Sequence, residues 1–129
     1  MATKLNLIGL IVKDMATTLD FYRQLGMEIS EEMNAEDHVE ITLPGGVRFA
    51  WDSESMIHSI DPAWKHPMGG HRVAFAFLCD TPEEVDTMYT RLIQNGAPSY
   101  RTPFNAFWGQ RYAQVLDPDG NVVDLFAYL

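Results

Sequence analysis

The chain has 129 residues, 47% of them hydrophobic and 21% charged, which fits one globular domain with a substantial core. Its net charge of −9 argues against a nucleic-acid partner, since phosphate binding needs a basic surface, and is compatible with neutral or weakly basic small molecules or with an ordinary solvated surface. No apolar run could span a bilayer, no signal-peptide pattern opens the chain, and the single Cys79 cannot form an internal disulfide, so we expect a soluble cytoplasmic protein without a membrane partner.

The first half of the chain predicts a strand, a helix and further strands. Residues 4–12 are apolar and β-branched, as in a buried strand. Asp14 can cap the next helix, and Gly26 supplies the left-handed residue that ends it. The apolar residues of this helix recur at helical spacing: Met15, Leu19, Tyr22 and Leu25. The remaining strand candidates are residues 28–30, 38–43 and 47–51.

The second half predicts the same elements in the same order. Residues 71–79 form an aromatic-rich apolar strand. Residues 81–84 are a capping box with proline at the first helical position, and Gly96 ends the helix. Its buried stripe is Val85, Met88, Tyr89 and Leu92. Strands are then predicted near residues 98–102, at 109–116 and at 121–127, the last two joined by a turn at 117–120.

The shared order indicates a duplicated supersecondary unit. Asp14 and Asp80 precede the two helices, and Gly46 and Gly120 precede the two last strands. We therefore predict an α+β fold made of two βαβββ modules in a single domain, residues 1–129. The expected boundaries are module one at 1–52, a proline- and glycine-containing linker at 53–70, and module two at 71–129.

Two sets of motifs carry a resemblance to a known family. They are Val12-Lys13-Asp14 with Phe21-Tyr22 and Leu25-Gly26, and Asp117-Pro118-Asp119-Gly120-Asn121 with Val123-Asp124-Leu125. The sequence thus resembles the vicinal-oxygen-chelate superfamily, which includes glyoxalases, bleomycin-resistance proteins and dioxygenases. The resemblance implies mixed sheets that curl into half-barrels, helices on their outer faces, a concave cup for the ligand, and a homodimer that completes the cups.

The enzymes of that superfamily hold a divalent metal with about four His, Glu or Gln side chains, from the first and last strands of both modules. The matching positions here are Leu7, Ala50, either His71 or Arg72, and Asp124. At most two of them are usable ligands, too few for a stable site. We therefore expect no metal, no other cofactor and no catalytic residue, with a residual site at His71 and Asp124 left open.

A narrower resemblance points to drug-binding proteins of the mitomycin-resistance type. It is carried by Trp51-Asp52, by residues 69–72, by the Phe107-Trp108-Gly109-Gln110-Arg111-Tyr112-Ala113 segment, and by residues 122–127. Uncharacterised relatives carry the Trp-Gly-Gln-Arg-Tyr segment too. In the resistance proteins a flat drug ring is held between a histidine and a tryptophan, and His38 and Trp108 stand at the matching places.

The candidate ligand-binding residues each have a structural alternative. His38 lies on the polar face of an alternating strand, which looks into the cup or into solvent. Trp108, beside Phe104 and Phe107 in a predicted loop, lines a binding wall or a local core or dimer contact. The remaining candidates are Asn105, which could instead satisfy loop backbone, Tyr112, which could be a buried structural tyrosine, and Arg48 and Asp124, at the rim or wall of the cup. Alternation instead places Trp51 with Val47 and Phe49, packed under a helix.

The resulting hypothesis is a metal-free protein that binds a planar aromatic, quinone-like antibiotic and confers resistance by sequestering it. Stacking suits such a ligand because it buries apolar rings without needing charge. The alternative is a metal-dependent glyoxalase-, epimerase- or dioxygenase-type enzyme with an atypical ligand set. A relative that binds an ordinary metabolite is a third possibility.

Overall fold

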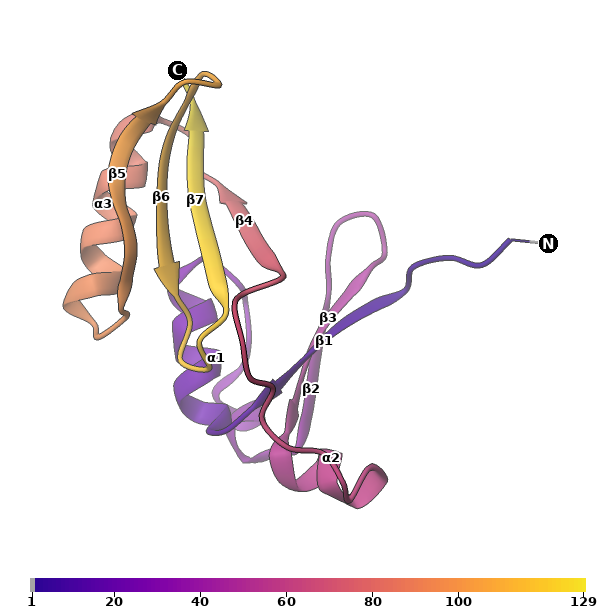
Figure 1. Cartoon of the computed structure of the whole chain (residues 1–129). Coiled ribbons are helices and arrows are strands. Elements are labelled where there is room, and N and C mark those ends of the chain that lie inside the picture. Colours follow the sequence, from indigo (N-terminus) through magenta and orange to yellow (C-terminus); the bar gives the residue numbers. More distant parts are fainter. Residues whose placement is uncertain (1) are drawn as a thin grey trace. The chain divides into compact units, whose positions relative to one another are not determined.

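The structure, a computed structural model, describes residues 2–129, which form two compact units (Figure 1). The first unit extends to Pro67 and the second covers Met68–Leu129. The elements of the first are β1 (Leu7–Val12), α1 (Met15–Gln24), a 3₁₀ helix (Glu31–Ala35), β2 (His38–Thr42), β3 (Arg48–Ser53) and α2 (Glu54–Ile60). Those of the second are β4 (Ala74–Leu78), α3 (Pro82–Gln94), β5 (Ser99–Ala106), β6 (Gln110–Leu116) and β7 (Val122–Tyr128).

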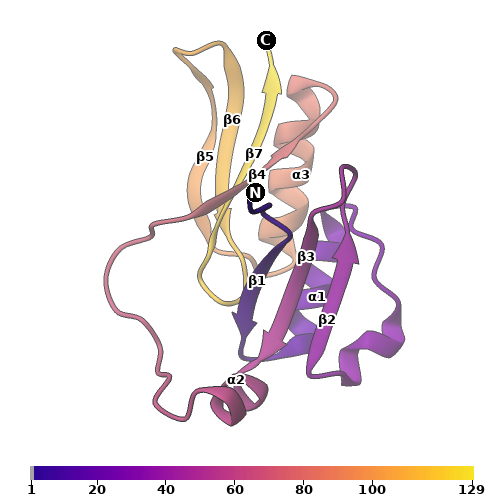
Figure 2. The same ribbon diagram turned by 90° about the vertical axis from the view of Figure 1, so that its right-hand side faces the viewer.

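The sheet of the first unit has the strand order β1-β3-β2, with β1 parallel and β2 antiparallel to β3. Figure 2 shows α1 lying along one face of this sheet. The core between them is aromatic: the ring of Trp51 lies 5.5 Å from Tyr22 and 5.0 Å from Phe49. Trp51 is fully buried, which confirms the prediction from strand alternation. Asp14 caps α1 as predicted, accepting a hydrogen bond from the Thr17 backbone.

The sheet of the second unit has the order β4-β7-β6-β5, and α3 packs on one of its faces. The predicted capping residues act at the start of α3, where Thr81 Oγ1 accepts from the Glu84 amide at 3.2 Å. The Glu84 carboxylate accepts from the amide of Asp80, one residue before the N-cap, at 3.0 Å. The helix contributes Val85 and Leu92 to the buried layer between helix and sheet. The strands contribute every second residue of β6 and β7, namely Ala113, Val115, Val123, Leu125 and Ala127. No helix of this unit, as far as residues 68–129 describe it, covers the opposite face of the sheet, which we call its open face.

The register of the strands confirms the duplication. In the first unit Leu7 pairs with Arg48 and Gly9 with Ala50. In the second, Ala74 pairs with Val122 and Ala76 with Asp124, in the same parallel arrangement. The two halves are thus built on one strand–helix–strand plan, as the α+β prediction requires.

The strand predicted at residues 28–30 does not form. The Arg23 side chain reaches these residues, where its Nε donates to the Ile29 carbonyl at 2.8 Å and its Nη2 to the Ser30 carbonyl at 2.9 Å. A guanidinium thus takes the carbonyls that a neighbouring strand would pair, and the chain then enters a 3₁₀ helix. The first sheet therefore has three strands where the second has four.

Other boundaries shift as well. β4 begins at Ala74 rather than at residue 71, and the predicted linker contains α2, whose first turn is capped by Ser53. β5 runs to Ala106, so Phe104 and Asn105 lie in a strand and not in the predicted loop. Pro103 is tolerated there because the register shifts between Arg101 and Phe104. Within residues 2–129, no helix is long and apolar enough to cross a membrane.

Candidate functional site

The open face of the second sheet carries a pocket of about 640 Å³. Along β6, Ala113 and Val115 are buried against α3, so the alternate residues Tyr112 and Gln114 project from the other face. These two residues line the pocket together with residues of β5, of the 107–109 turn and of the segment that leads into β4. All residues that line the pocket therefore belong to the second unit.

One side of the pocket is a cluster of rings that we call the aromatic wall: Tyr100, Phe104, Phe107, Trp108 and Tyr112. The Trp108 ring stands edge-on to Tyr112 at 5.3 Å, to Phe107 at 5.0 Å and to Phe104 at 6.3 Å. Phe107 is 97% exposed, Trp108 49% and Phe104 39%. Several adjacent aromatic side chains open to water are typical of a binding surface rather than of a core.

The local sequence holds this wall in place. Phe104 and Tyr112 are direct partners in the β5–β6 register, which puts their rings on one face. Gly109 has a φ of +90°, a conformation that favours glycine and closes the turn that presents Trp108. The indole Nε1 of Trp108 donates to Gln110 Oε1 at 2.8 Å, which fixes the orientation of the ring. The wall is thus pre-organised.

Two polar side chains beside the aromatic wall, Tyr112 and Gln114, donate hydrogen bonds to Asp124. Its Oδ2 accepts from the Tyr112 hydroxyl at 2.7 Å, and its Oδ1 accepts from Gln114 Nε2 at 2.8 Å. Burial, followed by the bond to Asp124, raises the pKa of Tyr112 well above its ordinary value, so this phenol stays protonated. Gln114 Oε1 is buried and receives no hydrogen bond within residues 2–129. This oxygen is the acceptor that a ligand N–H or O–H could use.

Asn105 lies away from the aromatic wall. Its side chain accepts a hydrogen bond from Arg111, its partner in the register, at 3.2 Å. Arg111 in turn forms an ion pair with Asp86 of α3 at 3.0 Å, so both residues belong to the helix side of the sheet. Asn105 does not line the pocket, whereas Trp108 and Tyr112 do.

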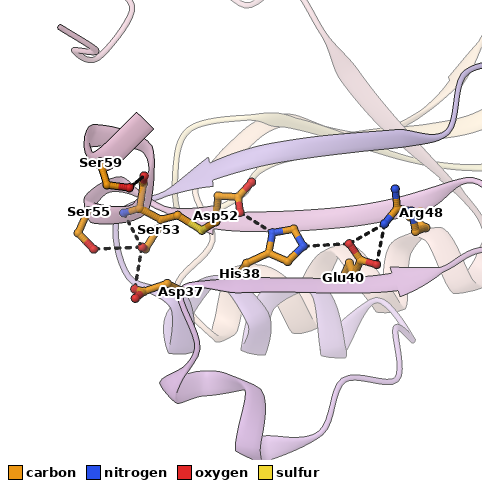
Figure 3. A network of polar contacts seen from close by, with 9 residues as sticks. Asp37, His38, Glu40, Arg48, Asp52, Ser53, Ser55 and Ser59 are labelled. Carbon is orange, nitrogen blue, oxygen red and sulfur yellow. Dashed lines mark hydrogen bonds and ion pairs between the residues drawn. The ribbon is translucent and has the colours of Figure 1, made fainter. Parts of the chain in front are cut away.

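His38 and Arg48 belong to a polar network on the open face of the first sheet (Figure 3). His38 Nδ1 lies 2.5 Å from Asp52 Oδ1, and its Nε2 lies 2.9 Å from Glu40 Oε2. Arg48 donates to Glu40 at 2.9 Å and to the Asn6 side chain at 2.6 Å. The hydrogen bonds to Asp52 and then Glu40 raise the pKa of His38, and those from His38 and then Arg48 lower the pKa of Glu40. The network therefore favours an imidazolium cation at His38.

The metal-ligand positions of the related enzymes do not carry a suitable donor set. Register places Ala74, and not His71 or Arg72, at the position equivalent to Leu7. The last-strand positions are Ala50 and Asp124, so only one of the four positions, Asp124, carries a side chain that could bind a metal. The His38 network offers no substitute, because its two carboxylates bind opposite edges of the imidazole ring. Within the described part of the chain, no three His, Cys, Asp or Glu residues are grouped to hold an ion.

The predicted site residues thus fall into two sets. Trp108, Tyr112 and Asp124 lie together in the second unit, while His38 and Arg48 lie together in the first. The clamp between His38 and Trp108 stays a prediction. Sequence reasoning missed Gln114, although its spacing of two from Tyr112 places it on the same strand face. It also missed the pocket residues Tyr100 and Arg101, and it considered Arg72 only as a metal-ligand position.

The whole chain has the sequence and fold of one superfamily. The family model for the glyoxalase/bleomycin resistance protein/dioxygenase superfamily matches residues 4–125. A family enzyme of that description from Burkholderia phytofirmans shares 21% identity over 98% of this chain and 100% of its own, with a TM-score of 0.81. A protein from Nocardioides of the same description shares 26% identity over 100% and 85%, with a TM-score of 0.73. A hypothetical protein from S. aureus shares 20% identity over 98% and 94%, with a TM-score of 0.78. No curated protein matches the sequence. The chain belongs to the glyoxalase/bleomycin resistance protein/dioxygenase superfamily.

Proposed function

We propose that this protein binds a planar, mostly apolar small molecule without a metal ion, and protects a cell by sequestering it. The observation that carries the proposal is the aromatic wall, where Trp108, Phe107 and Phe104 stand exposed beside a pocket of about 640 Å³. This volume lies within the range of small-molecule sites, roughly 300–1,000 Å³. A flat ring placed against the wall removes apolar surface from water on both partners.

The chemistry of the pocket supports binding rather than catalysis. Tyr112 is protonated and its hydroxyl is committed to Asp124, which leaves it unsuited to act as a general base. Asp124 itself accepts hydrogen bonds on both oxygens. No bond has to be made or broken for sequestration, because bound drug is withheld from its target by mass action. This function requires high affinity and an abundant protein.

The resemblance to mitomycin-resistance proteins supplies the finer form of this proposal. In that form a homodimer encloses a quinone-like drug, and the ring lies between Trp108 and the imidazole of His38. The fixed orientation of His38 between Asp52 and Glu40 supports it, because a ring held at both nitrogens presents its flat faces to a partner.

A metal-dependent enzyme is the rival function. It is favoured by the names of several similar solved structures, which include a family enzyme from Burkholderia phytofirmans and a glyoxalase-related enzyme from Fulvimarina pelagi. The apolar residues Leu7, Ala50 and Ala74 at three of the four ligand positions argue against it.

The test is a titration with planar quinone and quinoxaline compounds, chosen by thermal shift and followed by tryptophan fluorescence. Binding should quench the fluorescence of the parent, and Trp108→Ala should remove most of that signal. We expect Trp108→Ala to weaken binding by about 2–4 kcal/mol, since it loses both ring burial and stacking. His38→Ala should cost nearer ~1 kcal/mol, because a smaller ring is lost.

Trp64→Ala is the matched control, because this half-buried tryptophan lies outside the pocket, against His58 and His66 of the first unit. It should remove some fluorescence intensity while leaving the affinity unchanged. A Trp108→Ala protein that remains folded and binds the same ligand as tightly as the parent would exclude the aromatic wall as the binding surface.

A further inference from the structure

The pocket beside the aromatic wall is basic, in contrast to the rest of the chain. The whole sequence has 18 Asp and Glu residues against 9 Lys and Arg. The pocket is nevertheless lined by Arg72, Arg101 and His71 and by no carboxylate side chain of the described residues. A protein with a net charge of −9 disfavours a bound anion unless cations near the site compensate. The cationic lining of this pocket provides such compensation.

The two arginines of the pocket differ from three of the other four arginines in the chain. Three others each form an ion pair with a carboxylate: Arg23 with Asp20 at 2.7 Å, Arg48 with Glu40 at 2.9 Å and Arg111 with Asp86 at 3.0 Å. Across residues 2–129, neither Arg72 nor Arg101 has a carboxylate within ion-pair distance. The Arg101 guanidinium instead lies 5.9 Å from the centre of the Tyr100 ring, at the edge of the aromatic wall.

The acidic group bonded to the pocket residues Tyr112 and Gln114 has both of its oxygens occupied by hydrogen bonds. Asp124 accepts hydrogen bonds from Tyr112 and Gln114 and does not line the pocket. Its charge disfavours a second anion next to Tyr112 and Gln114, whereas the arginines favour one at the rim of the pocket. The pocket therefore separates an aromatic surface for a ring from a cationic rim for a charged substituent.

We propose that the ligand of this pocket is a planar aromatic acid, whose ring packs on Trp108 while its carboxylate pairs with Arg101 and Arg72. Arginine suits this task because its planar guanidinium can donate two parallel hydrogen bonds to a carboxylate. The inference rests on the proposed function, since it takes the aromatic wall as the surface for the ring. It adds the charge of the ligand, which the net charge of the chain does not specify.

The experiment compares two probes of equal shape, anthraquinone-2-carboxylate and anthraquinone-2-carboxamide, by calorimetry on the full chain at pH 7. We expect the carboxylate to bind about 5- to 10-fold more tightly, the effect of partly exposed charge-assisted pairs. Arg101→Gln and Arg72→Gln together should bring the two affinities within about two-fold of each other. They should lower the affinity of the carboxylate much more than that of the carboxamide. Raising the salt concentration should narrow the preference in the parent.

Two variants separate the parts of the proposal. Arg91→Gln removes an arginine of α3, on the other side of the sheet, and should keep the full preference for the carboxylate. Trp108→Ala should weaken both probes by the same factor and leave their ratio unchanged. Circular dichroism melts verify that each variant is folded.

The outcomes distinguish this inference from the proposed function. Equal affinity of the parent for both probes overturns the anionic ligand and leaves aromatic binding intact. A preference that survives in the double arginine variant overturns the assignment to Arg72 and Arg101. If neither probe binds at millimolar concentration, both the inference and the proposed function are overturned.

Discussion

Replacing Trp51 tests whether the first unit is held together as the structure indicates. Its side chain is fully buried, and its ring packs against those of Tyr22 and Phe49, which also contact each other. Its indole Nε1 is buried too, with no acceptor in the described chain. The residue therefore combines a large favourable burial with one unfavourable feature, an unpaired polar group. Two substitutions, Trp51→Ala and Trp51→Phe, separate these contributions.

The two variants should differ strongly in stability. Trp51→Ala removes the ring and leaves a cavity between Tyr22 and Phe49, so it should lower the free energy of unfolding by about 3–5 kcal/mol. Trp51→Phe loses only part of the ring, and it also removes the unpaired N–H, which relieves about 1–3 kcal/mol. We therefore expect a net loss of ~1 kcal/mol or less for Trp51→Phe.

Urea denaturation of both variants, followed by far-ultraviolet circular dichroism, measures these differences. Fluorescence should report the same transition midpoint, because a two-state analysis requires that the probes coincide in a chain with two compact units. Neither variant should change the affinity for a planar ligand per folded molecule. A Trp51→Phe protein as unstable as Trp51→Ala would refute the reasoning, since it would show that the indole N–H is satisfied and worth keeping.

Three further predictions concern metal, assembly and pH. Protein purified without chelator should carry no stoichiometric zinc, nickel, iron or manganese, because Leu7, Ala50 and Ala74 offer no donor; one tightly bound equivalent per chain in elemental analysis would contradict this. The edge strands β1 and β4 and the open sheet faces favour a homodimer at micromolar concentration, and a monomer mass by light scattering would contradict it. The pKa of His38, followed by NMR, should lie above 6.5. The stabilisation of the fold by protonated His38 should be fully present below pH 6.5 and should decline as the pH rises through the higher folded-state pKa. His38→Gln should therefore make the free energy of unfolding fall less steeply in that pH interval. An unchanged pH dependence would show that His38 is not its source.

The elements that the sequence predicted well are those with local physical signals. Thr81 and Glu84 specify the start of α3 through their own hydrogen bonds, and Asp14 does the same for α1. Strand alternation predicted that Trp51 is buried, because a period-two pattern depends only on neighbouring residues. The superfamily motifs and the repeat then indicated the overall architecture, which the family model and the solved structures support.

The errors arose where contacts beyond the immediate sequence neighbours decide the local structure. Residues 28–30 have strand-forming composition, but the Arg23 side chain binds their carbonyls from α1. Pro103 suggested the end of a strand, whereas a register shift lets β5 continue to Ala106. The basic pocket could not be predicted either, because Arg72 and Arg101 are separated in the sequence by β4 and α3 and line one pocket only in the folded unit.

The duplicated register also places the rings of His38 and Tyr112 at equivalent positions of the two units. With Ala50 equivalent to Asp124, the antiparallel pairs make Glu40 equivalent to Gln114 and His38 equivalent to Tyr112. Each of these rings projects from the open face of its sheet, and each bonds a carboxylate of the last strand in its unit. The scaffold therefore fixes which positions face a ligand, and the side chains there decide the chemistry. Leu7, Ala50 and Ala74 offer no metal ligand at the other positions, while the rings of His38 and Tyr112 offer flat faces at this one.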